Sequence, residues 1–129
     1  MARNRQETPT AVELEILAVL WQRGASTVRE IMEQLDEEKP RAYTSVLTML
    51  NVMLEKGLVD REPDGRAHRY RASQPQEATL AEIAQDVLAR AFSGSASSLI
   101  SHALAKAKPT ASELEAIQQV IDEYKEQSS

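Results

Sequence analysis

The sequence contains no cysteine among its 129 residues, which excludes disulfides, thiolate metal sites and a cysteine nucleophile. It also lacks any apolar run near the roughly 20 residues of a membrane span, and its polar N-terminus does not have the pattern of a signal peptide. We therefore expect a cytoplasmic protein without direct membrane binding. A chain this short can form one hydrophobic core but buries little apolar surface, so it often gains stability by forming oligomers.

Net positive charge is absent as well, because the chain carries a formal charge of −5. A basic domain is the usual mark of nucleic-acid binding, so the total charge argues mildly against it. The charge is uneven, however: residues 1–75 hold 11 basic and 12 acidic side chains, and residues 76–129 hold 4 and 8. Residues 65–71 contain three arginines and no acid. The acidity lies mainly in the second half, and the total charge does not exclude DNA.

Helix signals divide the first half into three helices. Thr10 and Glu13 have the spacing of a capping box, and the pair Thr27 and Glu30 repeats it. Apolar residues then recur at helical intervals up to Gly24 and over 27–35. A third helix is expected from about Arg41 to Lys56, with Ala42, Val46, Met49, Leu50, Met53 and Leu54 on its apolar stripe.

The periodicity changes to that of strands after this third helix. Residues 58–62 and 67–71 are predicted strands, and Pro63-Asp64-Gly65-Arg66 is the predicted turn between them. Three helices followed by a β-hairpin form a winged helix-turn-helix, in which the third helix enters the major groove of DNA. The fold class is therefore mainly α with one small antiparallel hairpin, over residues 9–72, preceded by a flexible arm at 1–8.

The second half is predicted as a helical dimerisation domain over residues 77–127, after a hinge at 72–76. Helices are expected at 77–92 and 97–107, and a last one begins at Pro109-Thr110 with a third capping box to Glu113. The apolar side chains expected to form the dimer contact are Leu80, Ile83, Val87, Leu99, Ile100, Leu114, Ile117 and Ile121.

The outer face of the third helix carries hydroxyl and amide groups, and residues 42–54 contain no charge. A solvated helix face more often carries Glu and Lys, so this face favours contact with a DNA groove. In the hairpin, alternation puts Arg69 and Arg71 on one face, for phosphates, and Tyr70 on the other, against the third helix. An edge strand that carries charge against aggregation is the alternative. The candidate DNA contacts are Arg41, Tyr43, Thr44, Ser45, Thr48, Asn51, Arg66, His68, Arg69 and Arg71.

Nothing in the sequence recommends an enzyme. His68 and His102 have neither cysteine nor a carboxylate at metal-ligand spacing, so we predict no metal and no cofactor. The serines at 95, 97 and 98 resemble loop and cap residues, with no base beside them.

The segments TVREIMEQL (27–35) and AYTSVLTMLNVMLEKGLVDREPDGRAHRYRA (42–72) resemble the penicillinase-repressor (BlaI/MecI/CopY) family, and the likeness extends over nearly the whole chain. The resemblance implies a homodimeric transcriptional repressor on a palindromic DNA operator. It also implies control of β-lactam-response genes, relieved when a membrane-bound metalloprotease sensor cleaves the tail.

Two positions depart from the family pattern. Members commonly carry a basic residue where this chain has Val52, which removes one expected backbone contact. The family's Asn-Phe cleavage site aligns with His102-Ala103, which has neither residue. The copper-responsive branch, which relies on cysteines, is excluded.

Two other functions stay open at this point. One is a ligand-gated winged-helix regulator, in which Trp21 or the tail lines an effector pocket. The other is a winged-helix protein-interaction module without a DNA role. The basic hairpin and the uncharged helix face argue against the interaction module, and Trp21 is expected to be part of the core at the end of the first helix.

Overall fold

The first two helices each begin at a threonine and a glutamate whose side chains accept hydrogen bonds from backbone amides at the start of the helix. The computed structural model describes residues 8–35 and 41–128. Helix α1 (Ala11–Arg23) follows the capping box of Thr10 and Glu13, and Gly24, at a φ of 87°, ends it. Helix α2 (Val28–Leu35) follows the Thr27–Glu30 pair, whose two reciprocal bonds measure 2.9 and 3.2 Å. These two predicted capping boxes are confirmed, and at the third the amide of Glu113 donates to the hydroxyl of Thr110 at 3.1 Å.

Helix α3 (Tyr43–Lys56) begins two residues later than predicted. Ala42 is its exposed N-cap, so this residue does not belong to the apolar stripe. Gly57 ends the helix in the left-handed region at a φ of 79°, where a side chain would be strained. Val46, Leu50 and Met53 are buried along one side of the helix.

The hairpin consists of β2 (Val59–Asp64) and β3 (Ala67–Ala72), which pair antiparallel from Val59 opposite Ala72 to Asp64 opposite Ala67. The predicted turn at 63–66 is wrong in length, because Pro63 lies in β2 opposite His68 and the loop is Gly65-Arg66. Proline is tolerated there because β2 is an edge strand and need not donate at every residue.

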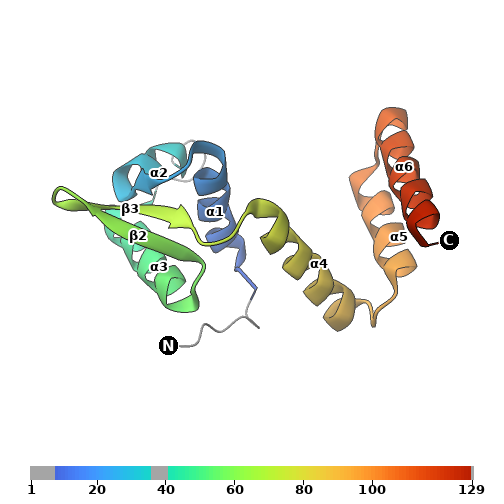
Figure 1. Cartoon of the computed structure of the whole chain (residues 1–129), viewed down its shortest axis with the longest axis horizontal. Helices are drawn as coiled ribbons and strands as arrows, with labels where there is room; N and C mark the ends of the chain where they lie inside the picture. The colour runs from blue at the N-terminus through green and yellow to red at the C-terminus, as the bar shows by residue number, and fades with distance from the viewer. Residues whose placement is uncertain (1–7, 36–40, 129) are drawn as a thin grey trace. The chain divides into compact units, whose positions relative to one another are not determined.

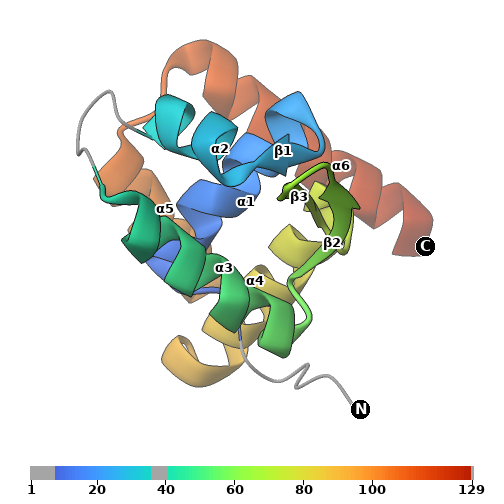
Figure 2. The ribbon, with the colours of Figure 1, turned by 90° about the vertical axis from the view of Figure 1, so that its left-hand side faces the viewer.

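A short strand that the sequence did not reveal completes the sheet. Strand β1 (Ser26–Thr27) pairs antiparallel with β3, opposite Tyr70 and Arg69, and gives the strand order β1-β3-β2. Helices α1, α2 and α3 pack around the core beside this sheet (Figures 1 and 2). The buried apolar side chains are Ile16, Leu17, Leu20, Val28, Ile31, Val46, Leu50, Met53, Val59 and Tyr70.

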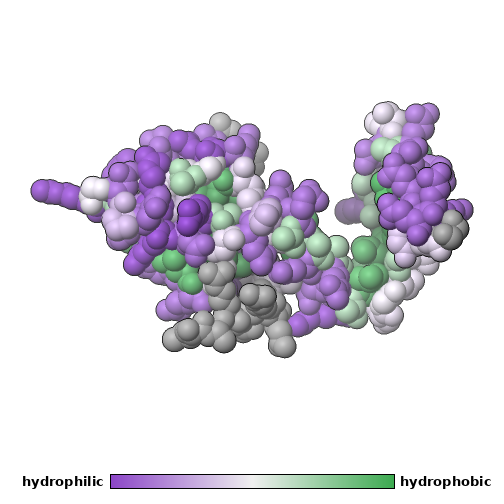
Figure 3. All heavy atoms as spheres, viewed as in Figure 1, coloured by the Kyte–Doolittle hydropathy of each residue, from purple (hydrophilic) through white to green (hydrophobic). Residues whose placement is uncertain are grey.

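Three helices follow the hairpin: α4 (Gln76–Ala91), α5 (Ala96–Ala107) and α6 (Ala111–Ser128). The chain forms two compact units that divide within α4, after Asp86. In α5 and α6, all of whose residues the structure describes, no side chain is buried. Large apolar side chains are accordingly exposed on both helices, among them Ile100, Leu114 and Val120, and those along α5 are visible in green in Figure 3. Among the helices described, none has the length and apolarity needed to cross a membrane.

Candidate nucleic-acid interface

The outer face of α3 is exposed along most of its length. Tyr43, Thr44, Ser45, Thr48 and Asn51 all reach solvent, as their helical positions opposite the buried stripe require. Hydroxyl and amide groups of this kind can bond to base edges and phosphates. The predicted uncharged face of α3 is therefore exposed, as a helix face that enters a DNA groove must be.

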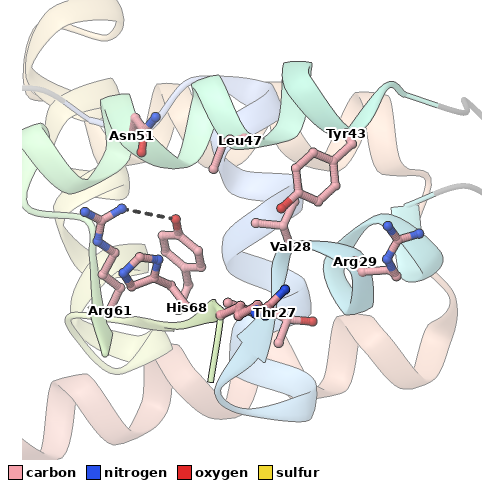
Figure 4. A pocket seen from close by; sticks show the side chains of 11 residues that line it. Thr27, Val28, Arg29, Tyr43, Leu47, Asn51, Arg61 and His68 are labelled. Carbon is pink, nitrogen blue, oxygen red and sulfur yellow. Dashed lines mark hydrogen bonds between the residues drawn. The ribbon is translucent and has the colours of Figure 1, made fainter. Parts of the chain in front are cut away.

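A hollow of about 540 Å3 lies between α3, the start of α2 and the hairpin (Figure 4). From α3, Tyr43, Leu47 and Asn51 line it, and from the hairpin Arg61 and His68 do so. We call this feature the basic hollow. Its other lining residues are Thr27, Val28, Arg29, Arg66, Ala67 and Tyr70.

Two of the arginines that line the basic hollow were missed from the sequence. Arg29 lies over the ring of Tyr43, with its guanidinium carbon 5.9 Å from the ring centroid, at cation–π distance. The Nη1 of Arg61 donates to the hydroxyl of buried Tyr70 at 3.4 Å, a long hydrogen bond. Arg29 and Arg61 are 32 positions apart, and only the tertiary fold brings them to one concave surface. No local sequence pattern could pair them.

The register of the hairpin separates its charges onto two faces. Directly opposed residues of an antiparallel pair project to the same side of a sheet, and successive residues alternate. Arg71 is opposite Asp60, and Arg69 is opposite Glu62, so these four share a face, which Asp64 joins by alternation.

The other face of the hairpin carries no carboxylate over the paired residues. Arg61 is opposite Tyr70, and Pro63 is opposite His68. Arg61, His68 and Tyr70 are also the side chains that line the basic hollow. The face turned toward α3 is thus the basic one, and the face that bears Arg69 and Arg71 carries three acids against these two arginines.

Arg69 is held by its own chain. Its Nε donates to Asp64 at 2.7 Å, and its Nη1 donates to Glu30 at 3.1 Å and to the Ala25 carbonyl at 3.2 Å. The bond to Asp64 and the charge of Glu30 raise the pKa of Arg69 above its ordinary value. Glu30 also pairs with Arg23 at 3.3 Å, so the hairpin is tied to the α1–α2 region.

The pKa of Glu30 lies below its ordinary value. The backbone amide of Thr27 contributes most to this lowering, followed by the charge of Arg69, while partial desolvation opposes it. Glu30 therefore accepts from the Thr27 amide at the start of α2 and is also one of the two carboxylates that accept from Arg69. Arg41, another predicted DNA contact, is half-buried and pairs with Glu15 at 2.9 Å.

The predicted dimer contacts lie on α4, α5 and α6 and are exposed or half-buried within a single chain. Leu80, Val87, Ile100, Leu114 and Ile121 are exposed, whereas the other three, Ile83, Leu99 and Ile117, are half-buried. Val120 and Tyr124 on α6 are the most exposed large apolar side chains of the described residues, at 65% and 70%. Exposed apolar patches of this kind mark interaction surfaces.

The predicted cleavage position lies in the middle of α5. His102 and Ala103 are both exposed, and the Nδ1 of His102 lies 2.8 Å from the carbonyl oxygen of Ser98 one turn earlier. The His102 ring also contacts Phe92, with 5.4 Å between centroids. Among the described residues, no group of three or more His, Cys, Asp or Glu side chains could hold a metal ion.

An exposed, uncharged helix face beside a two-stranded basic wing defines a winged-helix DNA-binding protein. The Penicillinase repressor family matches residues 9–123, nearly the whole chain. This chain belongs to that family, whose members are DNA-binding transcriptional repressors and not enzymes.

Similar proteins agree with this assignment. The chain is 36% identical over 93 residues to "Transcriptional regulator BlaI" of Mycobacterium tuberculosis, covering 70% of this chain and 67% of that protein. It is 21% identical to "Penicillinase repressor" of Bacillus licheniformis, covering 88% of each. It is 17% identical to "Methicillin resistance regulatory protein MecI" of Staphylococcus aureus, covering 92% of this chain and 97% of that protein.

Proposed function

We propose that this repressor binds a palindromic operator as a homodimer, with α3 in the major groove and the hairpin against the DNA backbone. The observation that carries the proposal is the exposed, uncharged face of α3 bordering the basic hollow. The uncharged face suits base edges, and the cations beside it suit phosphates. Membership of a repressor family supports the same conclusion.

Dimerisation follows from the modest charge of one subunit. The region up to residue 75 has a net charge of −1, and three of its arginines, Arg23, Arg41 and Arg69, are already paired with acids. Few cations per subunit give weak binding, whereas two linked half-sites bind far more tightly than either alone. The exposed apolar side chains of α4, α5 and α6 supply the surface for such a link.

Selection from random-sequence DNA by the full-length protein tests both parts of the proposal. We expect the selected sequences to contain two inverted half-sites, and light scattering to give the mass of a dimer in the free protein. Selection of a single asymmetric site by a monomer would contradict the dimer. Failure to enrich any sequence would contradict the DNA-binding function.

We further propose that the protein represses β-lactam-response genes. A membrane-bound metalloprotease sensor would relieve this repression by cleaving the chain at His102-Ala103. The names of the Bacillus and Staphylococcus relatives, a penicillinase repressor and a methicillin resistance regulatory protein, support the target class. Proteases bind extended chain, so α5 must unfold locally before it is cut. Because α5 buries no side chain within its own subunit, little packing opposes this opening.

Cells that express the full-length protein test the release. After exposure to a β-lactam, mass spectrometry is expected to find a fragment that ends at His102. A chain that stays intact while repression is lifted would contradict cleavage and point to another inducer.

No specific observation favours a ligand-gated regulator. Trp21 is not among the residues that line the basic hollow, and its indole Nε1 is bonded to the backbone of Gln74. No specific observation favours a protein-interaction module either, because that function does not explain the basic face of the hairpin.

A further inference from the structure

We infer that the hairpin meets DNA with its Arg61 and His68 face, joined by Arg29 of α2, and that Arg69 is a positioning residue that holds the hairpin in place. This inference rests on the proposed function and specifies which residues perform it. The hairpin contacts expected from the sequence were Arg66, His68, Arg69 and Arg71. The inference keeps His68, adds Arg61 and Arg29, and removes Arg69 and Arg71 from the phosphate contacts.

The first support is the sign of the charge on each face. Arg69 and Arg71 share their face with Asp60, Glu62 and Asp64, so that face has more acids than bases. A phosphate that approached it would meet three carboxylates. Such a face repels a polyanion at close range, and at physiological salt its field is screened beyond about 8 Å.

The second support is the geometry of the opposite face. Arg61 and His68 continue the side of the sheet that carries buried Tyr70, and they line the basic hollow together with Asn51 of α3 (Figure 4). Arg29 enters the same hollow from the start of α2. A phosphate strand lying beside α3 would therefore have cations from two other elements of the fold around it.

The third support is the set of partners of Arg69. Three oxygens, from Asp64, Glu30 and Ala25, lie 2.7 to 3.2 Å from its guanidinium. These partners come from β2, from α2 and from the turn after α1. A guanidinium with three acceptors in its own chain has few donors left for DNA, and breaking these bonds would free the hairpin from α2.

The test measures how the Kd for a selected operator depends on salt, using the full-length protein. The slope of log Kd against log salt falls by about 1 for each phosphate contact removed. We expect Arg61→Gln and Arg29→Ala each to reduce the slope by about 1 per subunit. We expect Arg71→Ala to leave it unchanged. Glutamine at 61 keeps a donor for the Tyr70 hydroxyl, and Arg29 is exposed, so neither change disturbs the core.

Arg69 has a different expected signature. Arg69→Ala is expected to weaken binding by at most about fivefold, the effect of an exposed ion pair, with no change in slope. Asp64→Asn should reproduce that loss, and the double variant should lose no more than either single one. Arg69→Lys should recover part of the affinity, because an ammonium can still reach one of the acids.

Three results separate the outcomes. If Arg69→Ala and Arg71→Ala reduce the slope while Arg61→Gln and Arg29→Ala do not, the inference is overturned and the other face meets DNA. If Glu62→Gln raises the affinity more than about twofold at physiological salt, its face lies close to phosphates and the inference is again overturned. If the unaltered protein selects no DNA at all, the proposed DNA-binding function is contradicted. That outcome is distinguishable from failure of this inference, because it is observed without any of the variants.

Discussion

The indole Nε1 of Trp21 donates to the carbonyl oxygen of Gln74 at 3.0 Å, which ties the end of α1 to the segment between the hairpin and α4. Trp21 also packs against the core, with part of its surface exposed. The bond joins residues 53 positions apart and gives the only tryptophan of the chain a structural partner.

Trp21→Phe is expected to lower the free energy of unfolding by about 1 kcal/mol or more, because a smaller phenyl ring replaces the indole and its hydrogen bond to Gln74 is lost. Urea denaturation followed by circular dichroism measures the change. Gln22→Ala is the control, because Gln22 is the exposed neighbour on the same helix, and it should change stability by less than about 0.5 kcal/mol. Equal effects of the two changes would mean that the Gln74 bond contributes nothing.

Glu13 and Lys56 form the most buried ion pair among the described residues for which side-chain exposure is given. The Glu13 side chain is 6% exposed, and its oxygens lie 3.0 and 3.1 Å from Nζ of Lys56, which joins the start of α1 to the end of α3. Lys56→Met would leave a buried carboxylate without this partner, and we expect a loss of about 2 kcal/mol in the free energy of unfolding. Lys106→Met, at an exposed position of α5, serves as the control in the same urea titration. A loss no larger than the control's would refute the prediction.

Local chemistry explains which elements were predictable. The capping boxes at Thr10 and Thr27 involve residues only three apart, so the sequence alone indicates where α1 and α2 begin. The hairpin loop was predicted too long because Pro-Asp-Gly is a strong turn signal, and nothing local shows that Pro63 sits on an edge strand. Its position depends on the strand order of the whole sheet.

The candidate site was predictable only in part. Alternation correctly separates Arg69 from buried Tyr70. It cannot show that Glu30, 39 positions away, receives Arg69. That contact depends on the pairing of β1 with β3, and a strand of two residues has no periodicity to detect.

Lowering the pH should weaken the hairpin attachment through Glu30. Its pKa is lower in the folded chain than its ordinary value of 4.5, so its contribution to stability is complete above that value. The contribution is lost as the pH falls through the lower, folded pKa. Glu30→Gln keeps a side-chain oxygen for the Thr27 amide but not the charge. Its urea midpoint should therefore fall less than that of the unaltered protein between neutral and strongly acidic pH.

Glu33→Gln controls for the loss of one negative charge, since Glu33 is an exposed acid of the same helix. It should retain the full pH dependence of the unaltered protein. If Glu30→Gln and Glu33→Gln follow the same curve, the lowered pKa of Glu30 makes no contribution to folding.

Asn51→Ala should affect sequence preference without affecting the phosphate contacts. Asn51 is exposed on α3 and lines the basic hollow, and an asparagine amide can pair with adenine. We expect the affinity for the selected operator to fall about 10- to 100-fold while the salt slope stays the same. The affinity for unrelated DNA serves as the control and should not change. A parallel loss on both DNAs would mean that Asn51 contacts no base.

Ile121→Glu should disrupt the dimer if the exposed stripe of α6 is the dimer contact. Ile121 is 36% exposed and lies on one side of α6 with Leu114 and Ile117. A carboxylate buried in an apolar interface is costly, so light scattering should show a shift from dimer to monomer. Ser112→Glu introduces the same charge on the opposite side of α6 and should leave the dimer intact.

Because linked half-sites bind far more tightly than single ones, the Ile121→Glu protein should also lose operator affinity by 100-fold or more, in order of magnitude, while its affinity for one isolated half-site stays the same. A dimer that persists in Ile121→Glu would place the contact elsewhere in the chain.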